Sequence, residues 1–290
     1  MKIKTLHLTA LYLCAVFLLM SCSDDDVQTN KYVPGGVMPA ILVVGQSNAE
    51  GWAPISSAPQ WLADSKYRLE NYGMWNPVLK QFQTYQLGVN VGSGNNADTK
   101  FAFDVFFAKA FLNDNNDKLL CIKHAMNGAP ISEKGHREIG RWQPKTELIP
   151  DGERKLAIEL AQKLQDAKDF AQKHNTQLKI IAILYHQGET DAYVNERLVD
   201  YEVNFKNLIT YIRGIAGSET IPVINAEVLP FSKNSLTLNS LFFQMNESDP
   251  YLKTVSMAGH YTHIGDRMHF DAAAFEYMGT KMYEYYKEIK

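Results

Sequence analysis

The sequence predicts an α/β fold in which a mainly parallel five-stranded sheet is covered by helices on both faces. Two observations support this fold class: continuous apolar runs suit strands that are buried on both faces, and amphipathic stretches of helical spacing lie between them. Strands that alternate with helices favour a parallel sheet between two helical layers. The predicted strands are Met38 to Gly45, Lys118 to His124, Leu178 to His186, Ile221 to Val228 and Leu252 to Met257. The predicted helices are Glu153 to His174, Asn195 to Ile215 and Asp271 to Ile289.

Length and composition predict one large domain over residues 37–290. The chain has 290 residues, of which 46% are hydrophobic and 11% aromatic, which is a globular composition. The formal net charge is −3, and the chain has no run of basic residues. A mildly acidic protein of this kind is a poor nucleic-acid binder, so we expect no nucleic-acid partner.

The first residues predict export and lipid anchoring. Lys2 and Lys4 precede an apolar stretch from Leu11 to Met20, which is too short to span a bilayer but suits a secretory signal over residues 1–21. The sequence Leu19-Met20-Ser21-Cys22 resembles the bacterial lipobox, in which the cysteine is acylated. Residues 22–36 then form an acidic and polar tether. We therefore expect a lipoprotein held through Cys22 at the outer membrane or cell surface; an ordinary signal peptide with a chance cysteine is the alternative.

The segment from Gly51 to Thr99 breaks the alternation of strands and helices. It is rich in Trp, Tyr, Asn and Gly and is long for a connection, so it is interpreted as functional loop and not as scaffold. Its aromatic side chains either stack on sugar rings or pack in the core, and the sequence leaves both options open. They are Trp52, Trp61, Tyr67, Tyr72 and Trp75. Outside this segment, Cys121 lies in an apolar run and is expected to be a buried structural thiol.

A serine follows the first predicted strand, at the edge where ligands bind in open α/β sheets. The strand ends in Gly45-Gln46-Ser47-Asn48-Ala49-Glu50-Gly51. A serine in a strand-to-helix turn exposes its hydroxyl, and its own amide can help to bind an oxyanion. The hydroxyl needs a base to become a nucleophile at neutral pH. Ser47 is therefore a candidate nucleophile, with a helix N-cap as the alternative.

Two further polar blocks lie at suitable positions. The third strand ends in His186-Gln187-Gly188-Glu189-Thr190-Asp191, and such a cluster directly after an apolar strand is costly unless it is paired or functional. A polar loop before the next helix is the alternative. Near the C-terminus comes Gly265-Asp266-Arg267-Met268-His269-Phe270. Asp266 and His269, three residues apart, can face the same way, so His269 can act as a general base whose tautomer is fixed by Asp266.

Together the three blocks resemble the sialate O-acetylesterase and acetylxylan esterase group, carbohydrate esterase family six, within the SGNH hydrolases. The shared motifs are Gln-Ser-Asn with flanking glycines, His-Gln-Gly-Glu-x-Asp and Asp-x-x-His-Phe, and they occur in that family's order over nearly all of residues 38–290. The resemblance implies a flavodoxin-like three-layer α/β/α fold and hydrolysis of O-acetyl esters on a glycan through an acetyl-enzyme, without a cofactor. It implies a triad of Ser47, His269 and Asp266.

The resemblance also implies the groups that stabilise the oxyanion. They are the amide of Ser47 and the side chain of Gln187. The family usually has a third donor, a glycine amide, and here Ala102 occupies that position; its amide can still donate if its φ is negative. Asn127 is a candidate wall residue of the site. Glu189 either helps to orient the histidine or braces its loop.

Two other functions compete with the esterase. His260, His263, Asp266 and His269 recur every three residues and are residue types that ligate zinc, which would suit a metal-dependent hydrolase. The spacing fits one helix poorly beyond two ligands, and we expect no metal. The second alternative is a glycan-binding lipoprotein with a weakened esterase site, which Ala102 and the aromatic segment would suit.

Overall fold

The computed structural model describes residues 35–63, 68–88, 99–134 and 139–289, all within one compact unit that spans Tyr32–Lys290. At its centre is a seven-stranded sheet with the order β4-β3-β6-β1-β7-β8-β9. Every neighbouring pair is parallel except β3 and β4, which are antiparallel. The strands are β1 (Gly36–Gly45), β3 (Arg68–Asn76), β4 (Gln81–Gln86), β6 (Leu119–Ala125), β7 (Thr176–His186), β8 (Val223–Ala226) and β9 (Leu252–Val255).

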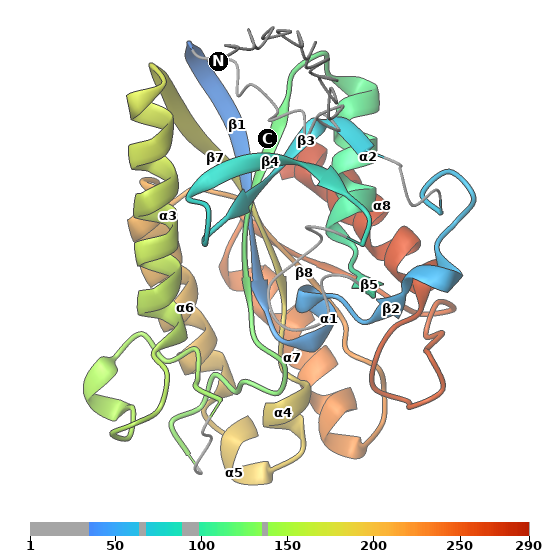
Figure 1. Cartoon of the computed structure of the whole chain (residues 1–290). Coiled ribbons are helices and arrows are strands. Elements are labelled where there is room, and N and C mark those ends of the chain that lie inside the picture. The colour runs from blue at the N-terminus through green and yellow to red at the C-terminus, as the bar shows by residue number, and fades with distance from the viewer. Residues whose placement is uncertain (1–34, 64–67, 89–98, 135–138, 290) are drawn as a thin grey trace, which may run out of the picture. The chain divides into compact units, whose positions relative to one another are not determined.

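Helices cover both faces of this sheet, as Figure 1 shows. On one face lie α2 (Asp104–Asp114) and α8 (Ala272–Ile289), and on the other lie α3 (Leu156–Lys173), α6 (Tyr201–Ala216) and α7 (Lys233–Ser248). The central strand β1 serves both cores, because alternate side chains of a strand point to opposite faces. Ile41 and Val43 belong to the first core, and Leu42 and Val44 to the second. The predicted three-layer α/β/α fold is confirmed.

The predicted number of strands is wrong. All five predicted parallel strands are present, but the sheet has two more, β3 and β4. Both arise from the segment interpreted as functional loop. The middle of β3 is interrupted by exposed polar residues, Glu70 and Asn71, so it lacks the continuous apolar run of a central strand. Its partner β4 lies at the edge of the sheet, and only two of its six residues are buried, so its sequence is not continuously apolar either. The hairpin turn is held by Asn76, whose Oδ1 accepts from the amides of Val78 and Leu79.

Several helices also differ from the prediction. The predicted helix over 195–215 is divided into α5 (Asn195–Leu198) and α6, with Val199 and Asp200 between them. The helices α2 and α7 and the two short helices α1 (Ser47–Glu50) and α4 (Glu189–Ala192) were not predicted. The hydroxyl groups of Ser232 and Ser235 cap the start of α7 reciprocally. Short helices cannot be recognised by apolar periodicity, because they contain little more than one turn.

The chain order of the parallel strands creates a switch point beside β1. The hairpin of β3 and β4 comes first and lies beyond β6. Among the five predicted strands, the chain then adds β6 on one side of β1 and later β7 on the other, which gives the order β6-β1-β7-β8-β9. This is the flavodoxin-like order, and ligands in such sheets bind at the carboxyl ends of the strands at that point. The ends of β1 and β7 carry the Ser47 and Glu189 blocks. The topology therefore brings two of the three predicted blocks together.

The predicted signal, Cys22 and most of the tether lie outside the described residues, so export and lipid anchoring stay predictions. Within the described ranges, no helix has the length and apolar character needed to cross a membrane. Cys121 is buried on β6, as expected. Burial raises the pKa of its thiol to about 12, with the nearby Asp104 carboxylate adding to the effect. A thiol with so high a pKa is a poor nucleophile at neutral pH.

A buried histidine makes the stability of the fold depend on pH. His124 on β6 is 5% exposed, and its Nδ1 lies 3.0 Å from the ammonium of Lys163 on α3. This Nδ1 must accept the hydrogen bond, so the ring is neutral. Burial lowers the pKa of His124 to about 4, although Glu159 beside Nε2 opposes the shift. As the pH falls, His124 therefore gains a proton in the unfolded chain before it does so in the folded chain. The contribution of neutral His124 to the free energy of unfolding is lost as the pH falls from about 6.5 to about 4.

We predict that His124→Gln is less stable than the wild type at pH 7.5 and that the difference shrinks by about 2–3 kcal/mol at pH 4.5. Glutamine keeps an acceptor for Lys163 but has no proton to gain. Urea denaturation at both pH values measures the two free energies of unfolding. The matched control is His260→Gln, at an exposed histidine. A difference between wild type and His124→Gln that stays constant with pH would contradict this account.

Candidate active site

Ser47 is the first residue of α1 and directly follows β1 and Gln46. Its side chain is nearly buried at 1% exposure. As the first helical residue, its amide has no partner within the helix. Within the described ranges, neither this amide nor the Ser47 hydroxyl is engaged in a hydrogen bond. The turn therefore presents an unoccupied hydroxyl and an unoccupied amide at the switch point. The alternative role as an N-cap does not apply, because Gln46 holds that position.

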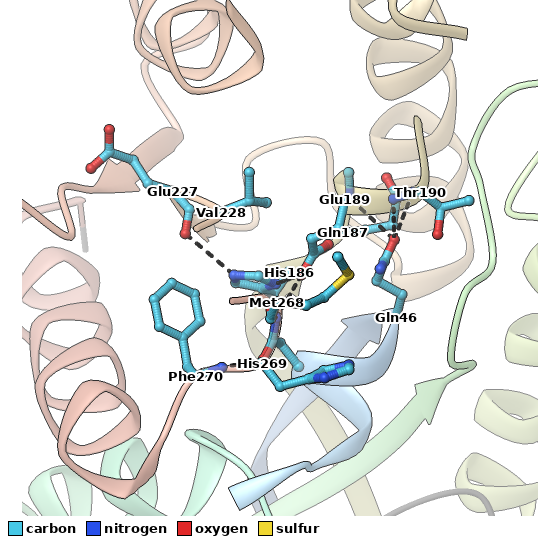
Figure 2. Close-up of polar contacts among 12 residues, drawn as sticks. Gln46, His186, Gln187, Glu189, Thr190, Glu227, Val228, Met268, His269 and Phe270 are labelled. Atoms are coloured by element: carbon cyan, nitrogen blue, oxygen red, sulfur yellow. Dashed lines mark hydrogen bonds and ion pairs between the residues drawn. The ribbon is translucent and has the colours of Figure 1, made fainter. Parts of the chain in front are cut away.

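Gly45 and Gln46 fix this turn against the end of β7. Gly45 has a φ of +150°, and a Cβ at this position would lie 1.9 Å from the carbonyl oxygen of His186. Only glycine allows the two strand ends to approach so closely. The Gln46 amide donates to that same carbonyl at 3.0 Å. The Gln46 side-chain oxygen lies near the amides of Gly188 and Thr190, as Figure 2 shows for Thr190.

Asn48 connects the Ser47 turn to both of the other predicted blocks. Its side-chain nitrogen donates to Glu189 Oε1 at 2.6 Å and to the Met268 carbonyl at 3.2 Å. Its side-chain oxygen accepts from the Phe270 amide at 3.0 Å. Asn48 is fully buried. One side chain therefore binds the backbone on both sides of His269 from the position next to Ser47.

His269 lies in a closed loop and is oriented by Asp266. Asp266 Oδ1 accepts from the amides of Met268 and His269, each at 2.9 Å, and Oδ2 lies 2.5 Å from His269 Nδ1. Arg267 between them has a φ of +61°, a left-handed conformation that a side chain other than glycine rarely adopts. Burial raises the pKa of Asp266, but the three hydrogen bonds outweigh it and the net shift is downward. The Asp266 carboxylate thus stays ionised and holds Nδ1.

The link between the Ser47 turn and the His269 loop runs through Asn48, which binds the residues on either side of His269. Among the described residues no hydrogen bond joins the Ser47 hydroxyl to the His269 ring, although Asn48 fixes the neighbours of both. Hydrogen bonds between catalytic groups often shorten only when the substrate binds. Figure 2 shows Met268, His269 and Phe270 passing beside the ends of the strands that carry Gln46 and His186.

Trp52 covers one face of the His269 ring. The two rings are stacked with centroids 4.0 Å apart and planes 12° apart. On Trp52 also lies the ammonium of Lys100, 3.3 Å from a ring centroid. Burial lowers the pKa of Lys100, while the charges of Glu50 and Asp266 oppose the shift. Trp52 therefore restrains the rotation of the imidazole, and among the predicted aromatics that the structure describes it is the one that stacks on His269.

The other aromatic residues of the same segment pack elsewhere. Tyr72 and Trp75 are buried in the two cores, at 0% and 6% exposure. The Trp61 ring packs edge-on against Phe106 and carries the ammonium of Lys109 on its face. Tyr67 lies outside the described residues. For Tyr72 and Trp75 the core-packing interpretation is therefore the right one.

The side chain of Gln187 forms hydrogen bonds with other buried residues. Its side chain is fully buried, and its amide nitrogen donates to Asp191 Oδ2 at 2.5 Å and to the Ala129 carbonyl at 3.2 Å. Its oxygen accepts from the hydroxyls of Tyr185 and Tyr201. An amide nitrogen has two hydrogens, and both have acceptors here. The predicted contact of Gln187 with an oxyanion would require these bonds to break, because burial of the block favoured internal pairing.

Glu189 braces the site. Its Oε1 accepts from Asn48 and lies 3.4 Å from Nδ1 of His186, and the side chain is fully buried. Its contacts reach His269 only through Asn48. Of the two roles left open by the sequence, bracing the loop matches this geometry. The His186 ring also contacts the residue after His269, because Phe270 packs edge-on against it with ring centroids 5.7 Å apart.

Ala102 lies against the turn that follows Ser47. A Cβ on Gly51, which has a φ of +121°, would stand 3.0 Å from the Phe101 carbonyl carbon and 3.4 Å from the Ala102 amide nitrogen. Glycine at 51 therefore allows the Ala102 amide to approach α1. In the described part of the chain, positive φ angles outside glycine occur at Lys80, Asn175 and Arg267, so φ of Ala102 is not positive. The condition for its amide to donate is met.

Asn127 lies at the surface beside α1. Its backbone amide donates to Glu50 Oε2 at 2.8 Å, and its side chain is exposed. Glu50 is buried, which raises the pKa of its carboxyl, although the Asn127 amide and the charge of Lys123 oppose the shift. Asn127 thus adjoins the helix that begins at Ser47, a position compatible with the predicted wall of the site.

The residues of the predicted zinc alternative do not converge. The His260 ring stacks on Tyr277 at 3.6 Å, and His263 Nδ1 faces the Gly265 amide at 3.0 Å. Only Asp266 and His269 contact one another. Over the described ranges, no three His, Cys, Asp or Glu side chains are grouped so as to hold a metal ion. The geometry offers no basis for a metal-dependent hydrolase at this loop.

Comparisons with known proteins agree with this fold and place the chain in a family. The family model described as "Carbohydrate esterase, sialic acid-specific acetylesterase" matches residues 38–288. A solved protein from Arabidopsis thaliana has a TM-score of 0.66 at 17% identity, over 88% of this chain and 98% of its own. NanS has a TM-score of 0.61 at 12% identity, over 88% and 97%. A carbohydrate acetylesterase from Xanthomonas citri has 0.54 at 15%, over 86% and 56%. No curated protein sequence matches the chain.

Fold and family model together define a carboxylic ester hydrolase. The match covers well over half of the chain, and the structural neighbours share the α/β fold. The chain belongs to the family of carbohydrate esterases that is described as sialic acid-specific acetylesterase. Its substrates are accordingly acetylated carbohydrates.

Sequence reasoning did not predict the contacts of two residues of this site, Asn48 and Trp52. The Gln-Ser-Asn motif contained Asn48, but a motif does not say what its amide binds 220 residues away. Trp52 was identified as a candidate for sugar stacking, and its actual neighbour is His269. Contacts over so long a sequence separation have no local signal in a single sequence.

We predict that Asn48→Ala destabilises the protein by about 2–3 kcal/mol, because it leaves the buried Phe270 amide and a Glu189 oxygen without their bonds to Asn48. Urea denaturation measures the change in the free energy of unfolding. Asn76→Ala is the matched control, since its bonds lie in the hairpin turn. Amide hydrogen exchange at Phe270 should rise in Asn48→Ala. Unchanged protection of Phe270 would show that Asn48 does not hold the loop.

Proposed function

We propose that this protein removes acetyl groups from the hydroxyls of a carbohydrate through a covalent acetyl-enzyme on Ser47. One observation carries the proposal: the side chain beside Ser47 binds the backbone on both sides of His269, while Asp266 lies 2.5 Å from Nδ1 of its ring. Membership of a carbohydrate esterase family supports the reaction class. Ser47 is the nucleophile, His269 the base, and Asp266 fixes the tautomer.

The chemistry proceeds in two halves. His269 Nε2 takes the proton of the Ser47 hydroxyl as its oxygen attacks the acetyl carbonyl, and it then returns that proton to the sugar oxygen as the carbon–oxygen bond breaks. In the second half His269 takes a proton from water, whose oxygen attacks the acetyl carbonyl, and it returns that proton to the Ser47 oxygen as the ester bond to Ser47 breaks. Acetic acid, which ionises to acetate, and free Ser47 result. Asp266 remains ionised throughout and stabilises the imidazolium that forms twice.

Two backbone amides are proposed to bind the oxyanion of each tetrahedral intermediate. The Ser47 amide stands at the start of α1, where it has no helical partner. The Ala102 amide adjoins the same turn and has a suitable φ. Gln187 is not included, since its amide is engaged with Asp191 and Ala129. Loss of one such donor typically costs about 3 kcal/mol of transition-state stabilisation.

Measuring acetate release distinguishes the proposed esterase from the alternative, a glycan-binding lipoprotein with a weakened site. We predict that the wild type releases acetate from at least one of acetylated xylan and O-acetylated sialic acid, and that Ser47→Ala lowers kcat on the order of 10⁴-fold or more. Ser57→Ala is the matched control, because that exposed hydroxyl only contacts the Pro54 carbonyl nearby.

The variant Glu189→Gln tests whether Glu189 only holds its loop in place or whether the reaction needs its negative charge. Glutamine retains an oxygen that accepts from Asn48, so its acetate release should stay within a few-fold of wild type if Glu189 only braces the loop. Retained glycan affinity without acetate release from any substrate would favour the binding protein. Equal release by wild type and Ser47→Ala would rule out Ser47 as the nucleophile.

A further inference from the structure

An exposed aromatic side chain lies beside the His269 loop and has no role in the chemistry above. Tyr193 directly follows α4 and is 61% exposed. Its hydroxyl contacts the sulfur of Met268, the residue before His269, at 4.0 Å. Among the large hydrophobic residues that are exposed in the described chain, Tyr193 and Phe243 are the aromatic ones, and Phe243 lies on α7. Tyr193 is therefore a largely exposed aromatic side chain in contact with the residue next to the proposed base.

The Tyr193 ring is held in place by its neighbours. It stacks on Phe231 with centroids 5.0 Å apart and planes 28° apart. Phe231 precedes Ser232, the N-cap of α7, so its backbone is anchored by the start of that helix. The Asn234 side chain donates to Asn195 Oδ1 at 2.8 Å and joins the same two loops a second time. A ring fixed before binding loses little conformational entropy when a ligand arrives.

The surroundings of the ring suit a sugar. A pyranose has an apolar face of C–H groups that packs on an aromatic ring, and its hydroxyls need polar partners around the edge. Exposed or half-buried amides and an ammonium adjoin Tyr193 and Phe231 along the chain, at Asn195, Asn234 and Lys233. We infer that Tyr193, supported by Phe231, is the platform for a sugar ring of the acetylated substrate. This inference rests on the proposed function, because it assigns the part of the substrate that carries or adjoins the ester.

The platform gives a clear expectation for substrate dependence. An acetyl ester without a ring uses Ser47 and His269 but not Tyr193. We predict that Tyr193→Ala lowers kcat/KM about 10-fold on the hydrolysed glycan, chiefly by raising KM, which corresponds to the loss of one stacking contact. On vinyl acetate the loss should be less than about three-fold by the same reasoning. Tyr193→Phe keeps the ring and should resemble the wild type on both.

The experiment measures kcat and KM for acetylated xylan, O-acetylated sialic acid and vinyl acetate with wild type, Tyr193→Ala and Tyr193→Phe. Val199→Ala is the control, as that side chain is 77% exposed in the same region of the chain. Calorimetric titration with xylo-oligosaccharide and with free sialic acid adds a binding readout that needs no turnover. Weaker binding of one sugar by Tyr193→Ala supports the platform even if the wild type is inactive, in which case only the proposed function fails.

Two results would overturn the platform. Equal losses on glycan and vinyl acetate would mean that Tyr193 merely supports Met268 and the His269 loop. Unchanged KM and unchanged sugar binding in Tyr193→Ala would mean that the substrate does not touch the ring. In either case Ser47-dependent acetate release would still stand, so the two hypotheses can fail separately.

Discussion

The side chain of Asn48 is the contact on which the site depends. It is the only side chain described here that reaches the Ser47 turn, the β7 loop and the His269 loop at the same time. The first and last of these segments lie 220 residues apart in the sequence, and the one described cysteine, Cys121, is free. The three hydrogen bonds of this buried amide hold the segments together, because breaking any of them leaves a polar atom unpaired in the interior.

Other residues of the site hold Asn48 and the loops that it contacts in place. Glu189 fixes the nitrogen of Asn48, and Gln187 with Asp191 fixes the loop from which Glu189 comes, since the Asp191 carboxylate also accepts from the amides of Ile131 and Ser132. Trp52 closes over the imidazole, and Lys100 lies on the indole. The buried polar residues thus hold the loops of the site in place.

Much of this could be predicted from the sequence, and the failures have physical reasons. The five predicted parallel strands were readable because burial on both faces makes their sequences largely apolar. The hairpin of β3 and β4 was missed because its strands carry polar residues such as Glu70 and Asn71 at exposed positions. Asp266 and His269 were paired correctly because three residues separate them. Gln187 shows the limit: a motif names the residue types, but the direction in which a side chain points is decided by distant partners such as Tyr201.

The most direct test of the account is covalent labelling of Ser47 by a fluorophosphonate, followed by mass spectrometry of the peptides. The reagent reacts with a serine only when a base raises its nucleophilicity. The account predicts one adduct, on Ser47, in the wild type, and a labelling rate lower by on the order of 10²-fold or more in His269→Ala. Labelling at another residue, or an equal rate at Ser47 without His269, would contradict it.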